Sequence, residues 1–380
     1  MSSSTHPIDG GAGPSVPVYA RPEYQVVRAL LPDIEHRRLS VREAAARMRD
    51  PQLVPVAINP LPRSPLIYFA DLGAHEYREW QHIITVQSLA GAGLVRDYFS
   101  APAELLDVAG LVPEPRRPRG FILHTSRCGS TVLCKALARA EGVAVLSQPA
   151  ALQHGFWAWI TGGWRLRRNW RPDSDARHVQ RFQNLVGLLC RPRLAAEREI
   201  FLKFISWNSL YVNFIQAAFP GVPTLFMYRH PVEVIASVMR ETSAARLARG
   251  TALAEFLAGK TARQLSEMDE VDYLSMCYVR NCAAIMHVPS QPSMLAFSKF
   301  APDTLGQVLA EAFALYPDKR QLERMRQPFA VYSKDDRNAV KYRDDSLLKR
   351  RMLSDDETRR VQQACQASWQ ALQNSARNVI

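Results

Sequence analysis

The stretch from Gly120 to Arg240 alternates short apolar runs with segments that carry apolar residues at helical spacing. Such runs predict buried strands, and apolar residues three or four positions apart predict amphipathic helices. We expect strands at 121–125, 143–146, 199–205 and 223–229, and helices at 130–140, 210–219 and 231–240. Asn208 or Ser209 is expected to cap the second helix. This alternation predicts an α/β fold, a parallel sheet flanked by helices.

The pattern differs on both sides of this stretch. Residues 1–20, rich in Ser, Gly and Pro, are expected to form a disordered leader. Residues 21–112 are expected to form an N-terminal, mainly helical α+β region, and the Pro/Arg-rich segment 113–120 links it to a larger domain at 121–380. Finer expectations are helices within 23–50 capped at Ser40, a strand at 65–73, a helix at 76–93, mainly helical structure at 250–330, and a last helix from about Asp355.

Composition narrows the class of protein. Apolar residues make up 47% of the chain, but no run approaches the roughly 18–20 apolar residues that cross a bilayer. The first residues lack the basic start and apolar core of a secretory signal. The six cysteines form no CxxC pair and no zinc-ligand spacing. We therefore expect a cytoplasmic protein with reduced thiols and no membrane partner.

The charge points to an anionic ligand. The net charge is +12, and 40 of the 48 basic residues are arginine. Such a balance favours anionic partners in general. The arginines are spread along the chain, however, and no RNP-like, KH-like or zinc-finger pattern accompanies them. We expect a small anionic molecule rather than nucleic acid.

The segment HTSRCGST, from His124 to Thr131, has the outline of a phosphate-binding loop between a strand and a helix. Against the pattern GxxxxGK[ST], it has His124 in place of the first glycine and Ser130 in place of the lysine. Backbone N–H groups at a helix N-terminus still favour an anion, and an arginine can bind two of its oxygens. The residues expected to contact an anion are Arg127, Cys128, Gly129, Ser130, Thr131 and Val132. A capped strand–turn–helix without a ligand is the structural alternative.

A second motif follows at the end of the strand 223–229. The sequence RHPVEVIASVMR places Arg229 at the strand end, Pro231 at the first helical position and Ser237 within the helix. Arg229 could fold back so that it and Ser237 meet one phosphate. The alternative is a surface arginine and a packing serine.

Together the two motifs resemble the P-loop sulfotransferases, in particular the bacterial members, which are relatives of the nucleotide kinases. The resemblance covers Gly120 to Arg240, with the motifs in the family's order and spacing. It implies 3′-phosphoadenosine 5′-phosphosulfate (PAPS) as co-substrate and no essential metal. The loop would hold the 5′-phosphosulfate, Arg229 and Ser237 the 3′-phosphate, and Arg127 would take up charge on the breaking S–O bond. A kinase-like activity would need a Walker lysine and magnesium ligands, and neither motif is found.

The resemblance fails at one important position. Bacterial members carry a glutamate after the second strand as the expected general base, where this chain has Gln148. An amide cannot take up a proton at neutral pH. Three explanations stay open: another base, with His154 and His124 as candidates; an acceptor that needs little help, such as a phenol or an amine; or a nucleotide-binding protein with weak or no catalysis.

Three further features are candidates for the site. Lys203, in an apolar strand, could contact the phosphosulfate during catalysis, or could be an edge lysine whose ammonium reaches water. Ser333, Lys334 and Arg337 could reach the 3′-phosphate from a late loop, or belong to a solvated charged loop. The stretch 164–171, rich in Trp and Arg, could grip an acidic or aromatic acceptor, small molecule or peptide, or be a basic surface loop.

Overall fold

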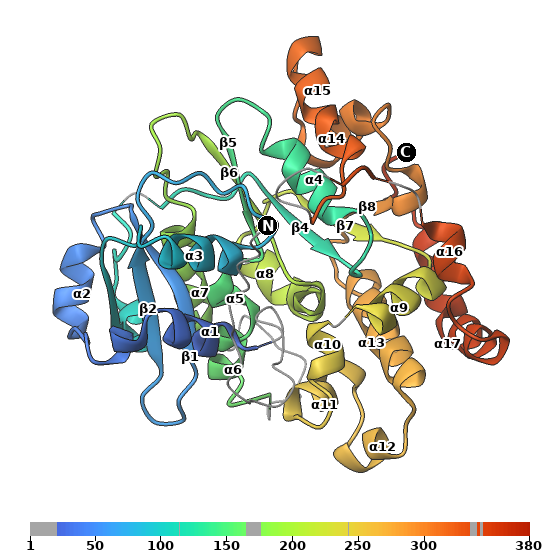
Figure 1. The fold of residues 1–380 in the computed structure, drawn as a ribbon, viewed down its shortest axis with the longest axis horizontal. Coiled ribbons are helices and arrows are strands. Elements are labelled where there is room, and N and C mark those ends of the chain that lie inside the picture. The colour runs from blue at the N-terminus through green and yellow to red at the C-terminus, as the bar shows by residue number, and fades with distance from the viewer. Residues whose placement is uncertain (1–20, 114, 165–175, 242, 335–339, 343–344) are drawn as a thin grey trace, which may run out of the picture.

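The computed structural model describes residues 21–113, 115–164, 176–241, 243–334, 340–342 and 345–380 (Figure 1). Its centre is a five-stranded parallel sheet in the order β5-β6-β4-β7-β8. These strands are β4 (Gly120–His124), β5 (Val143–Ser147), β6 (Glu199–Lys203), β7 (Thr224–Tyr228) and β8 (Ser293–Ala296). The α/β fold class predicted from the sequence is confirmed, and four of the five strands lie where the apolar runs predicted them.

Helices cover both faces of this sheet, because side chains of successive strand residues point to opposite faces. Ile122 and Phe201 pack with α4 (Ser130–Leu137), α14 (Leu305–Phe313) and α15 (Lys319–Arg326). Phe121 and Leu202 pack on the other side with α8 (Val212–Ala218), α9 (Pro231–Arg240) and α13 (Glu270–Met286). Strand residues alternate between two apolar cores, which explains why each strand reads as a continuous apolar run.

The N-terminal region holds a second sheet in addition to its helices. Three antiparallel strands pair in the order β1-β2-β3. They are β1 (Leu53–Asn59), β2 (Leu66–Asp71) and β3 (Tyr98–Pro102), with α1 (Glu23–Leu30), η2 (Pro32–Glu35), α2 (Val41–Arg47), α3 (His82–Gly91) and η3 (Ala103–Asp107) around them. Ser40 forms the expected capping box with Glu43. The expected leader lies outside the described residues, and the proposed domain boundaries stay a prediction.

Two helix starts differ from the sequence expectation. The expected helix 76–93 begins only at His82, and Glu76 to Gln81 lie outside it. The helix expected from Leu210 is preceded by the 3₁₀ helix η5 (Ser206–Tyr211), and the α-helix begins after Tyr211, so neither Asn208 nor Ser209 caps it.

The region 250–330 is mainly helical as predicted, with β8 inside it. The other helices of the described chain are α5 (Ala150–Gln153), α6 (Gly155–Ile160), α7 (Ala176–Leu189), α10 (Ala244–Leu247), α11 (Ala252–Ala258), α12 (Ala262–Ser266), η6 (Phe297–Lys299), η7 (Gln327–Ala330), α16 (Ser346–Arg350) and α17 (Asp355–Gln373). None of the helices in the described ranges is long and apolar enough to span a membrane.

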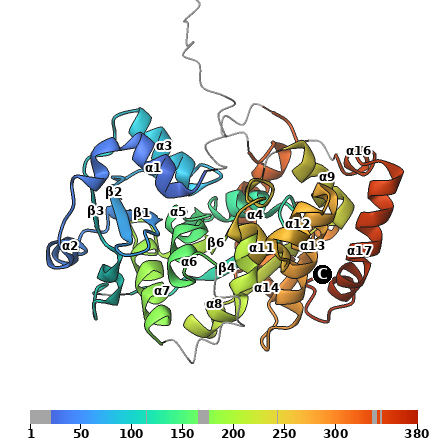
Figure 2. The ribbon, with the colours of Figure 1, turned by 90° about the horizontal axis from the view of Figure 1, so that it is seen from below.

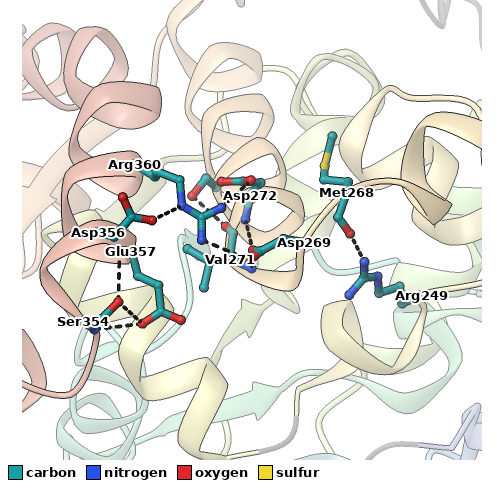
Figure 3. A network of polar contacts seen from close by, with 10 residues as sticks. Arg249, Met268, Asp269, Val271, Asp272, Ser354, Asp356, Glu357 and Arg360 are labelled. Atoms are coloured by element: carbon teal, nitrogen blue, oxygen red, sulfur yellow. Dashed lines mark hydrogen bonds and ion pairs between the residues drawn. The ribbon is translucent and has the colours of Figure 1, made fainter.

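The last helix is held against α13 by a polar network (Figure 3). Ser354 caps α17 and forms a capping box with Glu357. Arg360 on α17 donates to Asp272 at 2.6 Å and to Asp269 at 3.0 Å, and Asp269 itself caps α13. The α17 start predicted at Asp355 is confirmed, and α16 and α17 lie at the opposite end of the molecule from β1–β3 (Figure 2).

Candidate functional site

A cavity of about 440 Å³ opens where β4, β6 and β7 end. The carboxyl ends of parallel strands are the usual ligand-binding edge of an open α/β sheet. The loop after β4, Lys203 at the end of β6, and Arg229 directly after β7 all line it. Three segments far apart in the sequence therefore meet in one place.

The loop after β4 has a tightly turned backbone. Ser126, Arg127 and Gly129 have φ values of 78°, 52° and 80°, in the left-handed region that non-glycine residues rarely adopt. The thiol of Cys128 donates to the carbonyl of Met227 at 3.3 Å, which ties the loop to β7. A Cβ atom at Gly129 would lie 3.1 Å from the Phe297 ring. Helix α4 begins at Ser130, directly after this strained turn. The N–H groups of its first turn have no partner within the helix.

Lys203 is a buried ammonium at this helix start. Its side chain is 1% exposed, and Nζ donates to Thr131 Oγ1 at 3.1 Å. Burial lowers the pKa of Lys203. No carboxylate in the described residues forms an ion pair with it. The edge-lysine alternative is wrong, because β6 lies between β5 and β4.

Arg229 points inward and is 4% exposed, so the surface-arginine alternative is wrong. Its Nε donates to Glu233 at 2.6 Å, and its NH2 group donates to Ser346 Oγ at 2.8 Å. The guanidinium carbon lies 4.0 Å from the centre of the Phe297 ring. The guanidinium also donates to the carbonyl oxygen of Arg127 at 3.2 Å, so the two motifs are in direct contact.

Carboxylates already pair with the arginines of this site. Glu241 forms ion pairs with Arg127 and with Lys334, the latter at 3.1 Å. Asp345 lies 3.5 Å from Arg229 and 2.8 Å from Lys349. An anionic ligand that binds these arginines competes with these carboxylates for their N–H donors.

The remaining expected contacts divide into residues that line the cavity and residues outside the described part of the chain. The other loop residues named in the sequence analysis line the cavity, as do Ser237, Ser333 and Lys334. Ser237 is 2% exposed. Arg337, and all of 164–171 except Trp164, lie outside the described residues.

Neither histidine is placed as a free base. His154 does not line the cavity; its ring packs 4.6 Å from that of Trp164, and burial lowers its pKa to about 4. His124 does line the cavity, but the Ser126 N–H donates to its Nδ1 at 2.9 Å. Burial and the Lys203 ammonium hold the pKa of His124 well below its usual value. In the neutral ring Nε2 then carries the proton, so no lone pair is left to accept another.

Gln148 lines the cavity at the position where a base is expected. Its Oε1 accepts a hydrogen bond from Gln81 Nε2. Sequence reasoning missed Gln81, Trp80, Phe297 and Asn281, which also line the cavity. The segment with Trp80 and Gln81 was expected to be helical, and the other two residues lie in a region with no recognisable motif.

The described residues contain no cluster of three or more His, Cys, Asp or Glu side chains that could hold a metal ion. The cavity is lined by cations, hydroxyls, amides and backbone N–H groups, and its carboxylates, Glu241 and Asp345, pair with the cations. Such groups suit an anionic organic ligand rather than a metal ion.

Comparison with known proteins gives little further help. No family model matches the sequence, and no curated protein matches it. Among solved structures, the sulfotransferase domain from the curacin biosynthetic pathway aligns with 66% of this chain and 98% of its own length. The identity is 14% and the TM-score 0.35, so the alignment carries no argument.

Proposed function

We propose that this chain is a sulfotransferase that moves a sulfuryl group from PAPS to a hydroxyl, phenol or amine. The observation that carries the proposal is the Lys203 ammonium, 1% exposed and bonded to the Thr131 hydroxyl at a helix start. A buried ammonium is costly unless an anion compensates it. A phosphosulfate over the loop would supply the anion, and the nearby Arg229 would receive a second phosphate.

The proposed reaction uses these positions as follows. An acceptor oxygen or nitrogen attacks sulfur, the bond from sulfur to the bridging phosphate oxygen breaks, and adenosine 3′,5′-bisphosphate leaves. Arg127 and Lys203 stabilise the charge that grows on the bridging oxygen. The acceptor's proton passes to solvent, because the lone pair of His124 is occupied and Gln148 is an amide. This favours acceptors that need no base before they attack: phenols, which ionise readily, and amines, which attack through the nitrogen lone pair.

Calorimetric titration with adenosine 3′,5′-bisphosphate and with ATP tests the proposal. We expect the bisphosphate to bind more tightly than ATP. Lys203→Met should weaken the affinity for the bisphosphate by about 10- to 100-fold, which corresponds to the loss of one hydrogen bond to a charged group. The same variant should keep or raise the melting temperature of the ligand-free protein, because it removes a desolvated charge. Equal binding of ATP, or unchanged affinity in Lys203→Met, would contradict the proposal.

A second candidate is a nucleotide-binding protein with weak or no transfer activity. Gln148 favours it, since an amide held by Gln81 stands where a base is expected. Both candidates bind the bisphosphate, so transfer from labelled PAPS to a phenol distinguishes them.

A further inference from the structure

The exposed apolar side chains of the described residues are concentrated in one segment. Nine large apolar residues are exposed there, and six of the nine lie between Tyr332 and Met352. The six are Tyr332, Val340, Tyr342, Leu347, Leu348 and Met352. Single exposed apolar residues are common on folded proteins, whereas a group of them in one region marks an interaction site.

Helix α16 turns two leucines of this group outward. It packs against α9, where Arg350 donates to the buried Glu233 at 2.8 Å, and Lys349 is only 8% exposed. Positions two apart in an α-helix point about 200° away from each other. Leu347 and Leu348 precede these two inward side chains by two positions and therefore point away from α9. Their exposed fractions are 74% and 58%.

Basic residues accompany the leucines. The sequence from Leu347 to Met352 reads LLKRRM. Arg351 is exposed, and the Arg350 side chain stays 53% exposed although it pairs with Glu233. Apolar side chains and guanidinium groups thus share the outer side of α16 and the turn after it. We define the α16 patch as Leu347, Leu348, Arg350, Arg351 and Met352.

The carboxylates that follow the α16 patch have partners within α17. Glu357 accepts a hydrogen bond from the Ser354 hydroxyl at 2.9 Å, and Asp356 lies 3.2 Å from Arg360 (Figure 3). Both carboxylates also lie in the first turn of α17, where the partial positive charge of the helix N-terminus favours them. Their negative charge is therefore compensated in part within α17 itself.

The α16 patch adjoins the site cavity. Asp345, directly before α16, and Lys349 within it both line that cavity. Ser346, the first residue of α16, accepts a hydrogen bond from Arg229 at 2.8 Å. Helix α16 also lies at the outer end of the molecule, away from β1–β3 (Figures 1 and 2). A partner bound to this patch would lie next to the cavity and far from the N-terminal sheet.

We infer that the α16 patch binds the surface of an anionic lipid membrane. Apolar side chains enter the boundary between headgroups and acyl chains, and arginines beside them meet the lipid phosphates. A membrane surface accepts protruding leucines without a fitted pocket, which a protein partner would need. The net charge of +12 attracts the whole molecule to the same surface.

This inference goes beyond the proposed function and does not depend on it. The expectation of no membrane partner came from the absence of a segment long and apolar enough to cross a bilayer. A contact at the membrane surface needs no such segment.

Sedimentation with lipid vesicles tests the inference on the full chain, without nucleotide. Vesicles of phosphatidylcholine alone are compared with vesicles of phosphatidylcholine and phosphatidylglycerol in equal parts. At low salt we expect the mixed vesicles to bind at least about tenfold more tightly, because each basic residue near an anionic surface contributes about fivefold. High salt should reduce this preference, since it screens the charges.

The double variant Leu347→Ser, Leu348→Ser should bind the mixed vesicles about tenfold or more weakly, because two apolar side chains no longer enter the interface. Leu94→Ser is the matched control. Leu94 is 58% exposed, like Leu348, but follows α3 in the N-terminal region. All three leucines are exposed, so the melting temperature should stay the same in both variants.

Several results would overturn the inference. Equal binding to the two kinds of vesicle would remove the role of the basic residues. Unchanged binding of the double variant would show that net charge alone attracts the protein, and an equal loss in Leu94→Ser would place the contact elsewhere. If neither kind of vesicle binds, the inference is also overturned and the patch is left to a protein partner. None of these results bears on nucleotide binding, so the proposed function is tested separately.

Discussion

Gln148 lies at the position where the proposed transfer would need a proton acceptor. Its φ of 51° lies in the left-handed region, and its backbone N–H donates to the carbonyl of Lys203 at 2.6 Å. Its own carbonyl accepts from Gln153 Nε2 at 2.9 Å, and its side-chain oxygen accepts from Gln81. These three hydrogen bonds fix the backbone and side chain of residue 148. A side chain of the same shape is therefore expected to lie in the same place.

Gln148→Glu should therefore fold and gain activity. A carboxylate keeps the bond from Gln81 Nε2 and supplies the missing proton acceptor. General-base assistance contributes about 10²- to 10⁴-fold, and we expect a rate increase toward the lower end of this range with a weakly acidic phenol. The measurement is transfer from labelled PAPS. Gln148→Met, of similar size but without a base, is the control, and an equal rate in both variants would contradict the explanation.

Single residues also show what sequence can and cannot provide. Lys203, Arg229 and the loop could be placed at one edge of the sheet, because each lies at the end of an apolar run and the ends of parallel strands meet there. His154 was proposed as a base from its position six residues after Gln148, but it packs beside Trp164 instead. Gln81 and Asn281 line the cavity without any sequence signal, because their place there depends on tertiary packing.

At the scale of elements, the ends of α9 and α16 place carboxylates on the cations of the site. Glu241 follows α9 and pairs with Arg127 and Lys334; Asp345 precedes α16 and pairs with Arg229 and Lys349. These pairs hold the arginines in position but oppose an anionic ligand. A bisphosphate bound there would compete with these carboxylates for the same cations.

Glu241→Gln should raise the affinity for adenosine 3′,5′-bisphosphate. The Glu241 side chain is 39% exposed, so the pairs are partly screened, and we expect a gain of about two- to fivefold. Calorimetry at low salt measures it. Glu267→Gln on α12 removes a carboxylate from an exposed pair with Arg263 and should change nothing. Weaker binding by Glu241→Gln would show that Glu241 supports the nucleotide site.

The elements themselves were predictable to different degrees. Strands β4 to β7 are buried on both faces and read as continuous apolar runs, so the sequence predicted them. Strand β8 has four residues and lies between helices, and β1 contains Pro55 with an irregular register at Pro55 and Ala57. Short or proline-containing strands give too little periodic signal to be recognised.

At the scale of the whole molecule, the N-terminal sheet and the larger sheet share one core. Ile58 and Phe69 belong to the same buried cluster as Phe121 and Phe156. One close approach is at the start of α6, where a Cβ atom on Gly155 would lie 1.9 Å from the carbonyl oxygen of Ile58. Only glycine lets α6 contact β1 so closely.

Gly155→Ala should therefore destabilise the whole protein. Backbone must move to accommodate the methyl group, which costs about 1–3 kcal/mol by comparison with other overpacked sites. Denaturant unfolding measures the change. Gly91→Ala is the matched control, because a Cβ atom there meets nothing within 4 Å. Alanine is more stable than glycine in a helix, so this change should raise the free energy of unfolding by about 0.5–1 kcal/mol. Equal effects of the two changes would contradict the close contact.

In the proposed function, one doubly phosphorylated nucleoside spans the loop after β4 and the Arg229–Ser237 pair. Titration of the native protein with adenosine 3′,5′-bisphosphate and with adenosine 5′-phosphate tests it most directly. We predict that loss of the 3′-phosphate weakens binding by about 10- to 100-fold, and that Ser237→Ala weakens only the bisphosphate. Equal affinity for the two nucleotides in the native protein would contradict the account.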